Sequence, residues 1–342
     1  MELIIALSIL ILLILTEIFL RYFGPMLSVI DKYRVIDPHN WTNWILKPGY
    51  EITVEQTLDE RSKEGRELAV EHLKKTAEEK QLQPQDKMFA INKWGFKGPD
   101  FPLQKTKTRI ICLGDSTTFG SHYDSDCYPR ALERVLHNVE VINAGVLGYR
   151  VKNMLAMVDY YAQFKPDIAL IYLGWNDLFA DIKGIKSLYL YKAIKSVVDR
   201  IHPQERKFTD HYWNTTEKIN YEPSFFEDVI RLAKKLKSNW MEPVFLTLPC
   251  LYSTNSTPTE EMLSMGHLPL RSKNAYVFAQ MVESYNLWVR RFGELFNVRV
   301  IDTAKWAERE LDYTWYFDSL HLKHNGQIEM ANYIAGYLEI YR

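Results

Sequence analysis

Short apolar runs alternate with amphipathic stretches along the chain from residue 108 onward. Five runs are rich in Val, Ile, Leu and Phe and end at turn residues, so they predict β-strands at residues 109–113, 140–143, 168–173, 243–248 and 299–301. Helical periodicity fills the intervals, at about residues 128–136, 151–163, 224–237, 274–295 and 325–341. This alternation predicts an α/β domain whose parallel sheet is covered by helices on both faces.

The N-terminus carries a different pattern. Residues 3–20 are apolar apart from Ser8, Thr16 and Glu17. A helix of this length spans roughly 27 Å, which is just enough for the hydrocarbon core of a bilayer. The basic leader and small-residue cleavage site of a secretory signal peptide are both missing. The pattern therefore predicts an uncleaved transmembrane anchor over residues 1–23.

Between the anchor and the alternating pattern lies a region without strong periodicity. We interpret residues 24–104 as a stalk and cap, and residues 105–342 as the main domain. The spacing of Glu and Lys predicts one polar helix in the cap region, at residues 58–80.

Two segments interrupt the alternation inside the main domain. Residues 178–222 are rich in Lys and Tyr, and residues 185–201 can be drawn as an amphipathic helix. This helix could act as a lid or a membrane-surface element, or pack as an ordinary helix. Residues 250–272 are rich in Ser, Thr and Pro and could frame the mouth of a pocket, or form variable surface.

Composition narrows the function classes. The 342 residues carry a formal net charge of −1 with dispersed Lys and Arg, which argues against a nucleic-acid partner. Three Cys without a CxxC pair offer neither a disulfide framework nor a zinc knuckle. Aromatic residues make up 13% of the chain and suit a lipid interface, a sugar-binding groove or loop packing.

The candidate chemistry begins at Ser116. This residue follows the strand at 109–113 in a Gly-Asp-Ser turn, and open α/β sheets present nucleophiles at such strand ends. A serine hydroxyl needs a base, for which His321 is the candidate. Asp318 lies three residues earlier, close enough to orient the imidazole. His324 follows, but no acidic or Cys cluster supports a metal site.

A serine nucleophile also requires donors for the oxyanion of the tetrahedral intermediate. The candidates are the backbone N–H of Ser116, the backbone N–H of Gly148 and the side-chain amide of Asn176. Asp115 is expected to shape the turn at the nucleophile. We interpret Asp177, at the head of a helix, as structural.

Four segments together resemble the SGNH hydrolases, also called the GDSL lipase/acylhydrolase family. They are Ile-Cys-Leu-Gly-Asp-Ser at 111–116, Asn-Ala-Gly-Val-Leu-Gly-Tyr at 143–149, Leu-Gly-Trp-Asn-Asp at 173–177 and Asp-Ser-Leu-His at 318–321. The resemblance extends from about residue 92 to the C-terminus and leaves residues 1–91 unassigned.

The resemblance implies a flavodoxin-like three-layer α/β/α sandwich around a five-stranded parallel sheet. It also implies that Ser116 is the nucleophile, that His321 and Asp318 complete a triad, and that Gly148 and Asn176 are oxyanion donors. The family needs no metal or organic cofactor.

Three functions are compatible with these residues. The first is a membrane-anchored serine esterase that removes an acyl or acetyl group from a small-molecule, lipid or saccharide ester. The second is an O-acyltransferase acting on a saccharide or lipid, and the third is a non-catalytic scaffold subunit of a membrane assembly. The positive charges after residue 20 would place the main domain in the cytoplasm, whereas analogy with the family favours an extracytoplasmic domain.

Overall fold

The structure is a computed structural model of the 342-residue chain. It describes residues 2–29, 33–63, 67–120, 123–181, 210–269 and 272–338, together with Leu190 and Ile194. The helix expected at residues 185–201 lies almost entirely outside the described residues.

A five-stranded parallel sheet forms the centre of the main domain, as the alternating pattern predicts. Its strands are β5 (Thr108–Gly114), β6 (Val139–Gly145), β7 (Ile168–Tyr172), β8 (Glu242–Leu246) and β9 (Arg299–Ile301). They are arranged in the order β6-β5-β7-β8-β9, and all pairs are parallel. All five expected strands are confirmed to within three residues at each end. Residues 168–172 are buried throughout, as expected for a strand covered on both faces.

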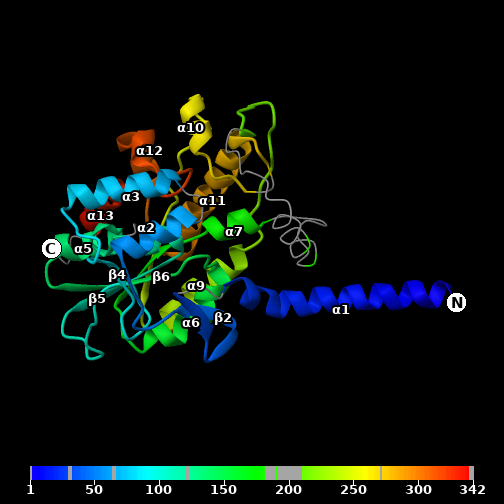
Figure 1. Cartoon of the computed structure of the whole chain (residues 1–342), viewed down its shortest axis with the longest axis horizontal. Coiled ribbons are helices and arrows are strands. Elements are labelled where there is room, and N and C mark those ends of the chain that lie inside the picture. Colours follow the sequence, from blue (N-terminus) through cyan, green and yellow to red (C-terminus); the bar gives the residue numbers. More distant parts are fainter. Residues whose placement is uncertain are drawn as a thin grey trace.

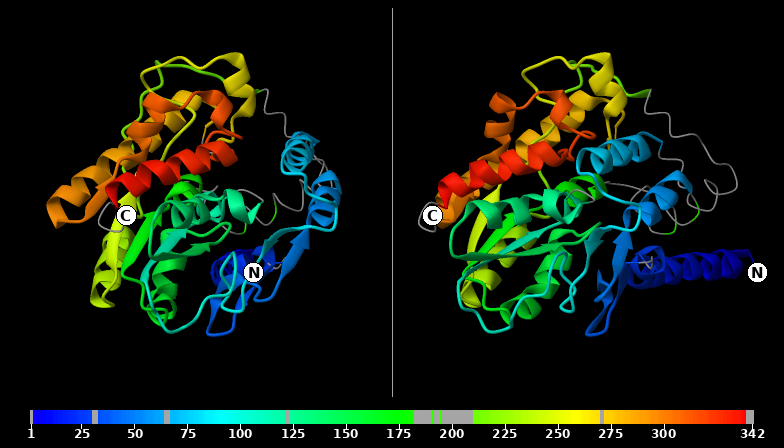
Figure 2. Two further views of the ribbon diagram at one scale, coloured as in Figure 1. Left: turned by 90° about the vertical axis from the view of Figure 1, so that its left-hand side faces the viewer. Right: turned by 60° about the vertical axis from the view of Figure 1, so that its left-hand side comes forward.

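Helices cover both faces of this sheet (Figures 1 and 2). On one face α5 (Tyr128–Val135) contacts α13 (His324–Tyr337), although the two are far apart in the sequence. On the other face α6 (Val151–Ala162) contacts α9 (Phe226–Ser238). α11 (Ala275–Phe296) stacks Trp288 on Phe226 of α9 at a centroid distance of 3.7 Å. Short helices complete the domain: α4 (Ser116–Phe119), α7 (Trp175–Ala180), α10 (Glu260–Met265) and α12 (Thr303–Glu310).

The strand order fixes where a site can form. Numbered along the chain, the five strands lie in the order 2-1-3-4-5, which is that of flavodoxin-like sheets. The strand order therefore reverses at β5, and open α/β sheets bind ligands at the carboxyl ends of the strands beside such a reversal. Residue 116 lies two residues beyond the carboxyl end of β5.

The region before the main domain contains elements that the sequence pattern does not predict. β1 (Arg34–Asp37) and β2 (Asn40–Leu46) form an antiparallel hairpin, and β3 (Glu51–Thr53) pairs with β4 (Lys87–Ala90). These strands are short, and their mixed polar and aromatic residues give no clean two-residue alternation.

The single helix expected at residues 58–80 is wrong. Two helices, α2 (Val54–Lys63) and α3 (Glu67–Glu79), occupy this part of the chain, and residues 64–66 lie outside the described residues. Leu73 and Ala77 of α3 are buried in the common core. The spacing of charged residues along a helix carries no information about such tertiary contacts. The prediction based on it therefore gave one solvent-exposed helix where the structure has two packed helices.

α1 (Glu2–Val29) extends away from the rest of the molecule and contacts the β1–β2 hairpin at its base (Figure 1). The helix is present as expected, but the predicted membrane span is not found. Among the described residues, none of the helices combines the length and hydropathy that crossing a membrane requires.

Candidate active site

The turn after β5 presents Ser116. Asp115 caps α4, and its Oδ1 accepts hydrogen bonds from the Thr117 backbone N–H at 2.9 Å and the Thr117 hydroxyl at 2.8 Å. A Cβ at Gly114 would collide with the Thr118 side chain and the Tyr172 carbonyl, so the chain can turn this tightly only with glycine at that position. Asp115 therefore shapes the turn, as the sequence suggests.

Ser116, His321 and Asp318 lie in one chain of hydrogen bonds. Ser116 Oγ is 2.8 Å from His321 Nε2, and His321 Nδ1 is 2.8 Å from Asp318 Oδ2. Asp318 Oδ1 also accepts from the backbone N–H groups of Leu320 and His321, both at 2.9 Å. Segments about two hundred residues apart are thus brought to hydrogen-bond distance, in the arrangement that activates a serine hydroxyl.

The protonation of this chain follows from its surroundings. Burial disfavours the Asp318 carboxylate, but the charge of His321 and the hydrogen bonds outweigh it and lower the pKa of Asp318 to about 2. Burial acts to lower the pKa of His321, yet the neighbouring Asp318 carboxylate raises it above its ordinary value. The pair thus keeps a carboxylate facing Nδ1 of the imidazole, which leaves Nε2 to accept the serine proton.

The loop carrying Asp318 and His321 is braced by neighbours that the sequence analysis did not single out. The buried Ser319 hydroxyl accepts from the His267 backbone N–H at 3.2 Å and donates to the His267 carbonyl. The Leu251 backbone N–H donates to the Ser319 carbonyl at 3.0 Å. Leu251 and His267, from the segment expected to frame a pocket or form surface, therefore pack beside the candidate site. No local motif marks Ser319, since its partners lie more than fifty residues away.

The two remaining oxyanion candidates lie on neighbouring segments. Gly148 follows β6 with a φ of +80°, a conformation that favours glycine. Asn176 is in the first turn of α7, and its Nδ2 donates to Asp115 Oδ2 and to the Tyr149 carbonyl, both at 3.1 Å. One amide thus joins the nucleophile turn, the loop after β6 and α7.

Asp177 links α7 to the segment that follows the Gly148 loop. Its Oδ2 accepts from the Val151 backbone N–H at 3.0 Å, at the start of α6. Burial raises the pKa of this carboxyl to about 7, and the Val151 hydrogen bond and the charge of Arg150 oppose the rise. This hydrogen bond agrees with a structural role for Asp177. The carboxyl group lies in the first turn of α7, as expected, and it also meets the N-terminus of α6.

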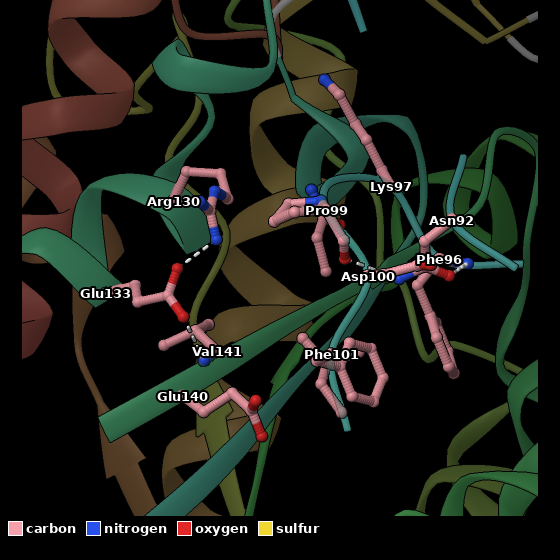
Figure 3. A pocket seen from close by; sticks show the side chains of 12 residues that line it. Asn92, Phe96, Lys97, Pro99, Asp100, Phe101, Arg130, Glu133, Glu140 and Val141 are labelled. Carbon is pink, nitrogen blue, oxygen red and sulfur yellow. Dashed lines mark hydrogen bonds and ion pairs between the residues drawn. The ribbon is translucent and has the colours of Figure 1, made fainter. Parts of the chain in front are cut away.

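A separate cavity of about 150 Å³ lies away from these residues, beside edge strand β6 (Figure 3). Its charged lining groups have partners. Arg130 pairs with Glu133, whose other oxygen accepts from the Val141 backbone N–H at 3.1 Å, and Glu140 pairs with Arg109 at 2.5 Å. These groups cover the edge of the sheet, and none of the residues predicted for the site lines this cavity.

Metal binding has no support in the part of the chain that the structure describes. No group of three or more His, Cys, Asp or Glu side chains there is arranged to hold an ion. His324, the residue near His321 that was considered as a metal ligand, is the first residue of α13.

Comparisons with known proteins identify the chain's relatives. No curated protein sequence matches it. Solved structures that resemble it include the lipase/acylhydrolase from Enterococcus faecalis, with 18% identity, 68% of this chain and 95% of that chain covered, and a TM-score of 0.42. The psychrotrophic esterase EstA from Pseudoalteromonas sp. has 14% identity, coverage of 68% and 98%, and a TM-score of 0.42.

A third similar structure is a GDSL-like lipase from Bacteroides thetaiotaomicron, with 13% identity, coverage of 68% and 88%, and a TM-score of 0.44. The profile of the GDSL-like lipase/acylhydrolase family matches residues 112–327, which is more than half of the chain. This protein therefore belongs to the GDSL-like lipase/acylhydrolase family of serine ester hydrolases.

Proposed function

We propose that this protein is a membrane-attached serine esterase that hydrolyses a carboxylic ester through Ser116, His321 and Asp318. The observation that carries the proposal is the pair of 2.8 Å contacts that link the Ser116 hydroxyl, the His321 imidazole and the Asp318 carboxylate. A serine needs such a base to act as a nucleophile, and the base needs a partner that fixes its tautomer.

In the first half-reaction, Ser116 Oγ attacks the ester carbonyl carbon while His321 Nε2 takes its proton. The resulting tetrahedral intermediate collapses as the bond to the leaving alkoxide oxygen breaks, and His321 returns the proton to that oxygen. The products are an acyl-enzyme and an alcohol. Asp318 stabilises the transient imidazolium without taking up a proton.

The negative oxygen of the intermediate requires hydrogen-bond donors. We assign these to the backbone N–H groups of Ser116 and Gly148 and to the Asn176 amide. In the free protein both Asn176 N–H groups have acceptors, on Asp115 and Tyr149. The oxyanion would replace one of these acceptors, and catalytic hydrogen bonds commonly tighten only in the transition-state complex.

In the second half-reaction, a water molecule attacks the carbonyl carbon of the acyl-enzyme while His321 removes a proton from that water. The tetrahedral intermediate then expels Ser116 Oγ, which recovers the proton from His321. If a saccharide hydroxyl takes the place of water, the same residues carry out acyl transfer. Products analysed with and without a polyol acceptor separate hydrolysis from transfer.

The substrate is proposed to be a lipid or saccharide ester met at a membrane. Helix α1 supports this attachment, because its large apolar side chains between residues 7 and 19 are 45–63% exposed. Exposed apolar surface of this extent marks a contact with a membrane or another apolar partner. We place the main domain outside the cytoplasm by analogy with the family. Carbonate extraction of membranes, compared between the native chain and Leu10→Glu/Leu12→Glu, tests the attachment, and a topology reporter at the C-terminus tests the side.

A fluorophosphonate probe tests the catalytic assignment without choosing a substrate. Ser116 Oγ should bond to phosphorus with loss of fluoride, giving one adduct on the peptide that contains Ser116. The adduct should disappear in His321→Ala. Well-folded protein that stays unlabelled and hydrolyses no short-chain ester would overturn the proposal and favour a scaffold role.

A further inference from the structure

The β1–β2 hairpin lies directly against the loop that carries Gly148. Arg34 Nη1 donates to the Leu147 carbonyl at 3.2 Å, and Trp44 Nε1 donates to the same oxygen at 3.3 Å. Arg34 pairs with Leu46 in the hairpin and Trp44 pairs with Ile36, which places both donors on one face. Two side chains from a segment outside the family match thus converge on one carbonyl.

That carbonyl and the Gly148 N–H belong to the same peptide group. The group is planar and trans, so its C=O and N–H point in opposite directions. Donors that hold the Leu147 oxygen toward the hairpin therefore turn the Gly148 N–H away from it. Hydrogen bonds accepted by a carbonyl also polarise the peptide, which makes its N–H a stronger donor.

Further contacts fix the loop against the hairpin. The Tyr149 hydroxyl donates to the Trp44 carbonyl, and the two rings lie edge to face with centroids 5.5 Å apart. Asn153 Nδ2 donates to Asn43 Oδ1 at 3.0 Å. The Tyr149 carbonyl in turn accepts from Asn176, so the hairpin is connected through one residue to the other oxyanion candidate.

The space around Gly148 agrees with this arrangement. A Cβ built there would lie 3.6 Å from Arg34 Nη1 and 3.7 Å from Trp44 Cζ2, which is ordinary contact. The hairpin therefore covers one side of the Leu147–Gly148 peptide at van der Waals distance.

We propose that Arg34 and Trp44 are positioning residues, which aim and polarise the Leu147–Gly148 peptide so that the Gly148 N–H binds the oxyanion. This inference rests on the proposed esterase function. It gives the N-terminal hairpin a part in transition-state stabilisation, although the hairpin supplies neither nucleophile nor base.

The test compares Trp44→Phe, Arg34→Met and Arg34→Lys in the full-length protein. Trp44→Phe keeps an aromatic ring beside Tyr149 and removes only the indole donor. Trp94→Phe is the matched control, because the Trp94 indole also donates to a backbone carbonyl, that of Phe101 at 3.1 Å. Each variant is assayed with 4-nitrophenyl acetate and with an alkyl boronic acid, whose tetrahedral adduct with Ser116 mimics the oxyanion.

We expect Trp44→Phe and Arg34→Met each to lower kcat about 5- to 20-fold with KM changed less than about twofold, a smaller loss than removal of an oxyanion donor itself. The boronate inhibition constant should rise by a similar factor. Arg34→Lys should recover part of the loss, and Trp94→Phe should stay within about twofold of the native protein. The acid limb of the pH profile should not move, since His321 and Asp318 are untouched.

Unchanged kcat and boronate affinity in both Trp44→Phe and Arg34→Met would overturn the inference, as would a rise in KM alone. Thermal melts identify a variant that fails to fold. If Arg34→Met is such a variant, the kinetics of the more conservative Arg34→Lys and Trp44→Phe test the inference in folded protein. A native protein that neither hydrolyses the ester nor reacts with the fluorophosphonate would refute the esterase proposal itself, and this inference with it.

Discussion

The two sides of Ser116 are built from different parts of the chain. On the triad side, His321 and Asp318 belong to one loop within the family match, and their mutual contacts span only three residues. On the oxyanion side, the loop at Gly148 is held by Arg34 and Trp44, more than one hundred residues earlier and outside that match. The orientation of the His321 ring is thus set by a contact within one short motif. The loop that carries Gly148, a candidate oxyanion donor, is instead held by side chains from a distant part of the chain.

The largest effect should come from the triad side. We expect His321→Gln to lower kcat at least about 10³-fold with little change in the free energy of unfolding, because it removes the base that activates Ser116. Steady-state kinetics and a thermal melt measure both. The exposed His137 provides the control, as His137→Gln should leave kcat unaltered.

Asp318→Asn should sharpen the comparison through its pH dependence. The raised pKa of His321 means that activity is lost as pH falls through a value above about 6.5, where the imidazole takes up a proton. Without the carboxylate that value should drop, so the acid limb of kcat/KM should move to lower pH while kcat falls about 10³- to 10⁴-fold. An acid limb that keeps its position in Asp318→Asn would show that another group sets it.

Removing a donor on the oxyanion side should cost less than removing the base. We expect Asn176→Ala to lower kcat about 10²- to 10³-fold, with fluorophosphonate labelling slowed and the acid limb unmoved. Asn332→Ala, at an exposed position of α13, is the control. Should Asn176→Ala keep native kcat, the donor would have to be sought elsewhere.

The last effect should appear in stability rather than in rate. The pKa of Asp177 is raised to about 7 by burial, so between about pH 4 and pH 7 the folded protein holds a proton that the unfolded chain has lost. Stability should therefore fall as pH rises through this window, by at most about 1.4 kcal/mol per pH unit from this group.

Asp177→Asn should flatten that slope, because its amide oxygen can still accept from the Val151 N–H without carrying a charge. Asp177→Ala should cost about 1–3 kcal/mol by leaving a buried N–H without its acceptor. Denaturant unfolding at pH 5 and pH 8 compares the three proteins. Equal slopes in the native protein and Asp177→Asn would assign the pH dependence to other groups.

The parts of the fold that the sequence predicts share one property. The strands around residues 111, 142, 170 and 245 are largely buried, so their apolar runs record their surroundings directly. The β1–β2 hairpin, the β3–β4 pair and the helices α2 and α3 were not predicted, because their short, mixed sequences are stabilised by contacts with distant residues. Burial of Leu46 and Leu73 is an example that no local pattern reveals.

The candidate site divides in the same way. Ser116, His321, Asp318 and Asn176 could be named in advance, because their chemical types occur at characteristic spacings beside predicted strand ends. Ser319 could not, since its role depends on its contact with His267. Arg34 could not either, because nothing in its local sequence indicates that it meets the Leu147 carbonyl.

The sequence by itself determined the α/β alternation, the five strands and the candidate side chains for the chemistry, since each leaves a local signature of periodicity or residue type. Only the tertiary structure decided that the serine, histidine and aspartate meet at hydrogen-bond distance, and that the N-terminal hairpin holds the Leu147–Gly148 peptide. The physical reason is that a hydrogen bond depends on distances of about 3 Å between atoms. Between segments one to two hundred residues apart, those distances are set by how the whole chain packs.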